Sequence, residues 1–260
     1  MATRFYLPSS GAAAVNPATS AQWDNTITGW ARRRCVLAKT NSGGLDLTWS
    51  GATALGADIL FAQYVSDPLS GPGTISGSVA ISIRSLESNP LANAILDLGV
   101  KVVSNDGLTV RGTLVAASGG AEFPTSAASR YVPKSIASCN FEDGDRVVIE
   151  IGAKKASTDD YTLTLQVRDD AAGDLDAADG DTDLESPWVE FFANLPFAVA
   201  INPAALELSL SLPSPAVFIS YPVRGDLRLF ELDRSRRGFS IDTNMRHFEL
   251  DTERRIFNVR

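Results

Sequence analysis

"DLGVKVVSNDGLTVRGTLVAA", residues 97–117, decides the fold class of this chain. Two alternating runs, 97–104 and 108–117, flank the sequence Asn105-Asp106-Gly107. Asp-Gly between two alternating apolar runs is a strong short-range signal for a β-hairpin. The stretch therefore predicts two antiparallel strands that are joined by a tight turn.

Similar runs occur on both sides of this hairpin, whereas helical periodicity is confined to residues 91–96 and amounts to one or two turns. Short strands separated by Gly, Asp and Pro predict an all-β protein with an antiparallel sandwich. Together with the two strands of the hairpin, the predicted strands number seven, and an eighth would complete a jelly roll, although an Ig-like sandwich remains the alternative. The further strands are predicted at 58–66, 74–85, 145–152, 161–168 and 187–192, with an eighth at either 132–141 or 35–49.

Composition divides the chain into four parts. Residues 1–57 are expected to pack on a jelly-roll-like sandwich, which spans residues 58–192. Residues 193–224 hold five of the thirteen prolines and predict an extended arm, because proline cannot donate to a β-ladder. Residues 225–260 contain four copies of a repeat of nine residues, R-x-F-x-[LIV]-D-x-x-x, of which the last stops after its apolar residue.

Each repeat predicts a five-residue strand followed by a four-residue turn that begins with Asp. Antiparallel pairing of successive repeats would place Phe230 opposite Phe239 and align the phenylalanines on one face. Burying one Phe side chain contributes roughly 1.5–3 kcal/mol, so this face needs a cover. We interpret the repeats as an assembly interface, with a sheet folded back on its own domain as the alternative. The interface residues are Arg228, Phe230, Leu232, Arg237, Phe239, Ile241, Arg246, Phe248, Leu250, Arg255, Phe257 and Val259.

The net charge, the length of the apolar runs and the number of cysteines limit the partners of the protein. A formal net charge of −8 argues against nucleic acid as the main partner. No run of 18 apolar residues predicts a membrane-spanning helix, so no membrane partner is expected. The two cysteines, Cys35 and Cys139, are interpreted as reduced core residues, which indicates folding in a cytoplasm.

Residues for catalysis or metal binding are few. His247 is the only histidine, so a Ser-His or Cys-His nucleophile pair and a Cys/His zinc site are not expected. The sequence predicts no enzyme and no cofactor. Asp179, Asp181 and Asp183 have the alternate spacing of a calcium loop, but Leu184 stands where that loop needs Gly. This weak calcium candidate is less favoured than a solvated acidic loop over residues 169–185.

Stacking of sugars on tryptophan is a second candidate for binding. Jelly rolls also occur in lectins, and an aromatic ring can serve as a platform for a glycan. A glycan partner is possible but not favoured, because tryptophan in a β protein belongs more often to the core. The candidate residues are Trp23, Trp30, Trp49 and Trp188.

Several stretches resemble structural proteins of tailed bacteriophages. They are the repeats, RFYLPSSGAAAVNPATSAQWD near the start, NDGLTVRGTL and FEDGDRVVIEIG in the middle, and SPWVEF near the end of the sandwich. The resemblance implies a virion component made in the bacterial cytoplasm, and it supplies no catalytic residues. Its implied partners are other copies of this chain, in a homo-oligomer, and other virion proteins. We expect a head decoration or cement protein. The alternatives are a tail or fibre-attachment component and a carbohydrate-binding jelly-roll module in host recognition.

Overall fold

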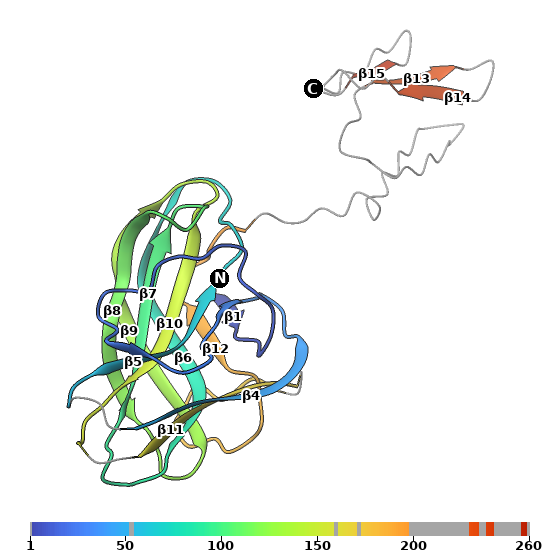
Figure 1. Cartoon of the computed structure of the whole chain (residues 1–260). Coiled ribbons are helices and arrows are strands. Elements are labelled where there is room, and N and C mark those ends of the chain that lie inside the picture. Colours follow the sequence, from blue (N-terminus) through green and yellow to red (C-terminus); the bar gives the residue numbers. More distant parts are fainter. Residues whose placement is uncertain are drawn as a thin grey trace. The chain divides into compact units, whose positions relative to one another are not determined.

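The structure is a computed structural model (Figure 1). It describes residues 2–51, 55–158, 161–170, 173–197, 229–233, 238–241 and 256–258. The chain forms two compact units, Met1–Ala198 and Val199–Arg260, which are described separately. All regular secondary structure in the described residues is β-strand, which confirms the all-β fold class. That part of the chain therefore has no helix able to cross a membrane.

The first unit has two six-stranded sheets, and eight of its strands form an antiparallel four-stranded part of each sheet. Numbered one to eight along the chain, they have the orders 1-8-3-6 and 2-7-4-5, the double Greek key of a jelly roll. The predicted jelly-roll-like sandwich is therefore confirmed. The first sheet contains β4 (Asn41–Ser50), β11 (Thr162–Asp170), β6 (Gly73–Glu87) and β9 (Ala128–Phe141). The second contains β5 (Asp58–Val65), β10 (Arg146–Lys154), β7 (Ile95–Val103) and β8 (Val110–Glu122).

The hairpin that opened the sequence analysis is present as β7 and β8, which pair antiparallel. Gly107 in its turn has a φ of 80°, a left-handed conformation that glycine adopts without strain. The Asp106 carboxylate accepts a hydrogen bond from the Leu108 N–H at 3.0 Å, as Asp commonly does in turns. The turn chemistry seen in the sequence therefore fixes this hairpin locally.

The observed secondary structure differs from the predicted strands in three respects. Both candidate regions for the eighth strand form strands, β4 and β9, so the sandwich begins before residue 58. The strand predicted at 187–192 is β12 (Trp188–Phe191), which extends the first sheet between β6 and β1 (Thr3–Tyr6). The helical turn expected at 91–96 does not form, because residues 95 and 96 already belong to β7.

The core lies between the two sheets and takes every second residue of each strand. Val147, Ile149 and Ile151 of β10 face it from one sheet, and Leu163 and Leu165 of β11 from the other. All five are fully buried. The alternation that predicted the strands is therefore the alternation that fills the core. Both cysteines are free and buried.

The start of the predicted arm belongs to the first unit. The Phe197 ring packs edge-on against Phe5 with ring centroids 5.6 Å apart. The Leu195 N–H donates to the Thr3 hydroxyl at 2.8 Å, and the Ser70 N–H donates to the Pro196 carbonyl at 2.9 Å. These contacts attach residues 195–197 to the N-terminal strand and to the segment before β6. Residues 198–224 of the arm lie outside the described residues.

The described part of the second unit is a three-stranded antiparallel sheet. Its central strand is β13 (Leu229–Asp233), flanked by β14 (Gly238–Ile241) and β15 (Ile256–Asn258). Phe230 pairs with Ile241 on one side and with Phe257 on the other, and Leu232 pairs with Phe239.

The predicted pairing of Phe230 with Phe239 is thus wrong by two residues. The physical reason is that β13 continues to Asp233, which pairs with Gly238. A slip of two residues preserves the alternation, so the sequence pattern does not distinguish the two registers. Seven of the proposed interface residues lie outside the described residues: Arg228, Arg237, Arg246, Phe248, Leu250, Arg255 and Val259.

Candidate functional site

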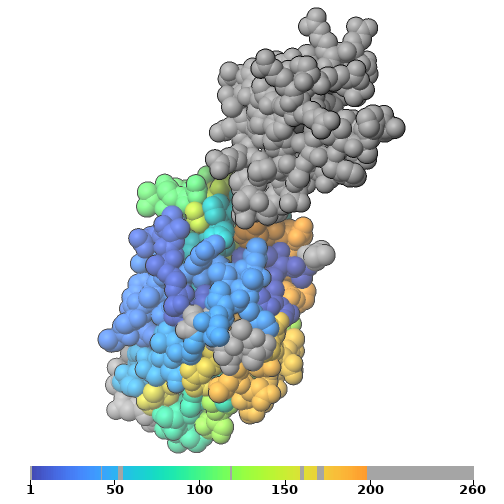
Figure 2. Space-filling model, turned by 90° about the vertical axis from the view of Figure 1, so that its right-hand side faces the viewer, coloured from blue at the N-terminus to red at the C-terminus, as the bar shows by residue number. Residues whose placement is uncertain are grey.

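The outer face of the second sheet is covered by the N-terminal part of the chain. We call residues 13–27 the strap. The strap ends in β2 (Asn25–Thr26), which pairs in parallel with β5, and farther along the chain β3 (Arg32–Arg34) does the same. These pairings occupy the outer edge of β5, which would otherwise be open to other strands. Figure 2 shows residues of the N-terminal segment (blue) at the surface of the body.

An apolar contact holds the beginning of the strap. Ala13 and Val15 pack on a small cluster formed by Val65 of β5, Val103 of β7 and Val148 of β10. These three valines point away from the core between the sheets, and all are buried. The second sheet is therefore apolar on both faces at this end, which explains why β10 reads as an almost continuous apolar run.

A buried ion pair lies next to these valines. Lys101 of β7 donates from Nζ to Glu150 Oε1 of β10 at 2.8 Å, and Gln63 of β5 donates from Nε2 to the same oxygen at 2.9 Å. The side chains of Lys101 and Glu150 are only 4% and 1% exposed. Removing two charges from water is costly unless all their hydrogen bonds are made, so the remaining partners decide whether this pair stabilises the fold.

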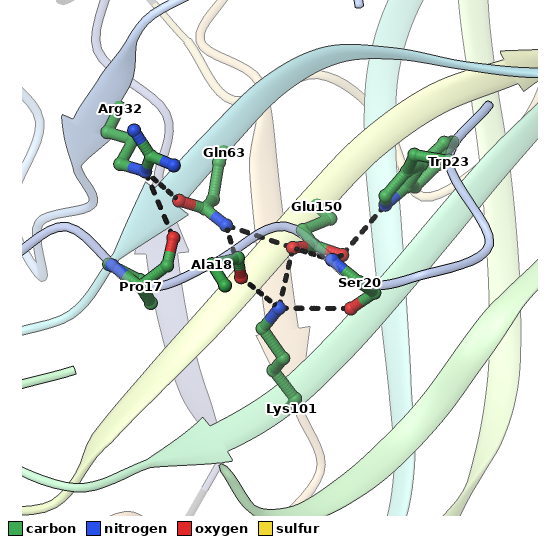
Figure 3. A network of polar contacts seen from close by, with 8 residues as sticks. All are labelled: Pro17, Ala18, Ser20, Trp23, Arg32, Gln63, Lys101 and Glu150. Atoms are coloured by element: carbon green, nitrogen blue, oxygen red, sulfur yellow. Dashed lines mark hydrogen bonds and ion pairs between the residues drawn. The ribbon is translucent and has the colours of Figure 1, made fainter. Parts of the chain in front are cut away.

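The strap supplies those partners (Figure 3). The Ser20 N–H donates to Glu150 Oε1 at 3.0 Å, and Trp23 Nε1 donates to Oε2 at 2.7 Å. Lys101 Nζ donates in turn to the Ala18 carbonyl at 2.6 Å and to Ser20 Oγ at 3.0 Å. Both charges are therefore satisfied jointly by the sheet and by the strap.

Arg32 extends the network at its edge. Its Nε donates to Gln63 Oε1 at 2.9 Å and to the Pro17 carbonyl at 3.0 Å. The guanidinium also lies 4.7 Å from the centre of the Trp30 ring, in a cation–π contact. Arg32 therefore connects β3 to both the strap and the network.

The electrostatics of Glu150 follow from these contacts. Burial by itself raises the pKa of this carboxyl, because it penalises the charged form. The hydrogen bonds from Lys101, Ser20 and Trp23 and the charge of Lys101 outweigh burial, so the pKa of Glu150 is lowered from its ordinary value. Glu150 is therefore ionised at neutral pH, and its hydrogen bonds connect the strap to the sheet.

The acidic loop, the weak calcium candidate of the sequence, lies on the first sheet. Asp179 Oδ1 accepts from the Tyr131 N–H at 2.7 Å. Asp181 accepts from the N–H groups of Asp176 and Asp183 at 3.2 and 2.8 Å. Backbone donors therefore already use Oδ1 of Asp179 and both carboxylate oxygens of Asp181. In the described residues no three acidic, His or Cys side chains are arranged to hold a metal.

We expect removal of calcium to leave the melting temperature unchanged, because the loop is fastened by its own N–H groups. The measurement is thermal melting in EDTA and across a calcium titration. Asp181→Ala serves as a comparison, since it removes two acceptors and should lower the melting temperature equally with and without calcium. A saturable rise with calcium that is absent in Asp181→Ala would contradict this expectation.

The tryptophans provide little open surface for a glycan. Trp23, Trp49 and Trp188 are buried, with 9%, 8% and 1% of their surface exposed. Trp30 is half-buried and has the Arg32 guanidinium on its ring. Three of the four candidate platforms therefore belong to the interior, and stacking of a sugar on them would require local unfolding.

Comparison with known proteins gives fold-level matches alone. No family model and no curated protein sequence matches this chain. Among solved structures, an aminopeptidase from a marine sediment archaeon of the Thaumarchaeota matches with 9% identity and a TM-score of 0.45. A CocE/NonD family hydrolase from Staphylococcus aureus matches with 7% identity and a TM-score of 0.39. Each alignment covers 73% of this chain but only 36% of the other chain.

A viral structure is also among the matches. The structure of the Gt strain of infectious bursal disease virus has 11% identity and a TM-score of 0.28, over 58% of this chain and 35% of that chain. The prediction that this chain is not an enzyme is corrected by the two hydrolase matches and is withdrawn. At these identities and TM-scores the matches assign neither an activity nor a substrate to the chain.

Proposed function

We propose that this protein is a structural component of a tailed-phage virion and that it acts by protein–protein assembly. A head decoration or cement protein is the role that we favour. The observation that carries the proposal is that the paired strands of the repeats belong to a second compact unit, Val199–Arg260, and not to the unit that contains the jelly roll. Sheets of such short strands require packing against another element for stability, so the repeats need a cover.

The partners follow from the same argument. If a second copy or another virion protein covered the repeats, burial of their phenylalanines would stabilise the association. The stretches that resemble tailed-phage proteins support this assignment and, with it, a location in the virion. A tail or fibre-attachment component would use the same interface, and the number of copies per particle distinguishes the two: many for a lattice on the head, few for a vertex or fibre site.

Removal of the second unit is the direct test. We expect the full chain to form oligomers in sedimentation velocity and the chain ending at Ala198 to be monomeric. The melting transition of the first unit should change little, because the jelly roll and its contacts through Phe197 remain. Equal oligomeric states of both proteins, or a strongly lowered melting temperature of the shortened chain, would contradict assembly through the repeats.

Point variants make the test specific. Phe239→Ala/Phe248→Ala removes two repeat phenylalanines, and truncation of a buried Phe typically costs about 3–5 kcal/mol. The matched control is Ser240→Ala/Glu249→Ala, which changes the neighbouring positions of the same two repeats. We expect association to be lost in the phenylalanine variant and kept in the control, with both retaining the melting temperature of the first unit.

A further inference from the structure

The edges of the two sheets in the first unit differ in how they are protected. A sheet edge exposes unpaired backbone N–H and C=O groups, to which another strand can bind unless the edge is covered. The outer edge of β5 is covered by β2 and β3, which pair with it in parallel. In β1, Tyr6 exchanges two backbone hydrogen bonds with Val36, at 2.8 and 3.2 Å. Both of these edges are therefore closed to a further strand.

Side chains of β9 protect the outer edge of β8. Lys134 donates from Nζ to the Gly119 carbonyl at 2.6 Å, and Arg130 donates from Nε to the Glu122 carbonyl at 2.6 Å. The pairing of β8 with β7 also shifts in register at four places, which twists the edge. β9 itself contains Pro133, a residue that hinders further pairing at an edge.

β4, the edge strand of the first sheet beside β11, has no such protection. Among the described residues, its backbone is hydrogen-bonded only in the ladder with β11. Residues 44–50 contain neither proline nor lysine, the residues that natural sheets commonly place at an exposed edge. β4 therefore presents a strand edge that is ready to pair with another extended segment.

The regular part of β4 is the segment 44–50. It is bounded by Gly43 and Gly51, which have φ of 82° and 134°, and its register with β11 is continuous. Leu47 is its middle residue. Its side chains alternate between two faces, with Leu45, Leu47 and Trp49 on the side of the core and Gly44, Asp46, Thr48 and Ser50 exposed.

This segment is complementary to itself in an antiparallel pair. If Leu47 lies opposite Leu47 of a second copy, all seven residues have a partner. The register then places Leu45 opposite Trp49, so that core-facing side chains meet core-facing side chains. On the exposed face, Asp46 lies opposite Thr48.

The charges of the segment allow this pair. Asp46 is its only charged residue, so no two like charges lie directly opposite each other. The Asp46 carboxylate is also paired with Arg168 of β11, whose Nη2 lies 2.6 Å from Oδ1. The negative charge on each side of the pair is therefore already balanced within its own sheet.

We propose that β4 pairs with β4 of a second copy in the assembled protein, with Leu47 at the two-fold axis, and joins the first sheets of the two copies into one sheet. The partner is a second copy because the segment is complementary to itself over its whole regular length. A two-fold contact of this kind uses the same surface on both copies.

This inference rests on the proposed assembly through the repeats. The pair involves seven residues on each side, whereas a stable interface uses roughly 20–30 residues on each side. The contact is therefore weak by itself and forms when the repeats hold two copies together and raise the effective concentration of their β4 edges. The chain ending at Ala198 lacks the repeats and remains monomeric.

Disulfide cross-linking of the full chain tests the pair and its register. The variants are Asp46→Cys and Thr48→Cys, whose introduced thiols lie opposite each other in a mixed pair. Opposite Cα atoms in antiparallel strands are roughly 4.5–5.5 Å apart, within the span of a disulfide. In pairs of a single variant the thiols lie diagonally, roughly 7–8 Å apart. We expect covalent dimers to form at least about tenfold faster in the mixture than with either variant alone.

The matched control is Thr113→Cys, at an exposed threonine of β8, the edge that β9 protects. Mixed with Asp46→Cys, it should give no more cross-linking than the single variants. One variant of each mixture carries a tag, so that mixed dimers are identified by their mass. Thermal melting of each variant verifies that the first unit is folded.

Sedimentation velocity of the same samples separates this proposal from assembly through the repeats. Oligomers in which the mixture of Asp46→Cys and Thr48→Cys cross-links no faster than the control would overturn the β4 pair and leave the repeats as the interface. A strand of another protein on this edge would give the same result. Monomers without cross-links would contradict both proposals.

Charge at residue 48 gives a second test without cysteine. Thr48→Glu places a carboxylate opposite Asp46 of the second copy, and Thr48→Lys places an ammonium there. Like charges opposite each other destabilise a strand pair and unlike charges stabilise it. We expect the full chain to associate at least about twofold more weakly with Thr48→Glu than with Thr48→Lys, because each two-fold contact contains the pair twice. Equal association of the two variants would overturn the proposed register.

Discussion

Lys101→Met is expected to lower the free energy of unfolding by about 3–5 kcal/mol, the range observed when one partner of a buried ion pair is removed. Methionine fills most of the space of the lysine stem, so the loss comes from Glu150. Its carboxylate would remain buried, with the strap donors Ser20 and Trp23 and with Gln63 but without a cation. Urea unfolding at neutral pH, followed by circular dichroism, measures the effect.

The pH dependence of this variant separates lost charge from lost packing. Without Lys101, burial dominates and the pKa of Glu150 should rise, since burial already acts in that direction. The deficit relative to the unmodified chain should then be largest at neutral pH and shrink as the pH falls, because protonation removes the uncompensated charge. A deficit that does not change with pH would indicate a packing defect.

The double variant Lys101→Met/Glu150→Gln is the matched control. It removes both charges and keeps an amide that can accept hydrogen bonds from Ser20 and Trp23. Replacement of a whole buried ion pair by neutral groups is often close to neutral in stability. We expect it to recover most of the loss. A double variant as unstable as Lys101→Met would show that the ion pair itself, and not the avoidance of an unpaired charge, stabilises the strap.

The jelly roll was accessible from the sequence because its strands carry local signals. The apolar run of β10, the alternation in β11, and the Asp-Gly turn between β7 and β8 each specify a strand or hairpin without reference to the rest of the chain. β4 and β9 were less clear. β4 contains two consecutive glycines, and β9 contains Pro133, which an edge strand tolerates.

The strap and its network could not be predicted in the same way. Lys101, Glu150 and Gln63 each interrupt an apolar strand, which marks them as unusual, but their partners are separated from them by up to 130 residues. The strap residues that complete the network lie in a segment without periodicity. A single polar residue inside an apolar run is the signal that was available, and it indicates a covered outer face without revealing what covers it.

The repeats illustrate a different limit. Their pattern identifies strands and the alternation of positions, but it repeats every two residues within a strand. Pairing of Phe230 with Phe239 or with Ile241 therefore satisfies the same pattern. Only the extent of β13, which continues to Asp233, decides between the two registers. The apolar positions alone therefore do not determine the register in this region.

Trp23→Ala is expected to destabilise the first unit by about 3–5 kcal/mol, as truncation of a buried large aromatic side chain typically does. The residue combines two contacts: its ring packs over Gly152, and its Nε1 donates to Glu150. Trp23→Phe separates them, because it keeps most of the ring contact and leaves Glu150 without one donor. Loss of a hydrogen bond to a charged group should cost about 1.5–3 kcal/mol.

The matched control for Trp23→Ala is Trp30→Ala, at the half-buried tryptophan whose cation–π contact with Arg32 contributes about 1 kcal/mol. Thermal melting and binding to a glycan array should be measured for both. If Trp23 holds the strap on the sheet, the decrease in melting temperature should be several times larger for Trp23→Ala than for Trp30→Ala. If Trp23 were a platform for a sugar, its loss would abolish glycan binding and leave the melting temperature unchanged. Its burial and its bond to an ionised carboxylate favour the first result, since a ring that packs against Gly152 and is only 9% exposed offers little surface to a ligand.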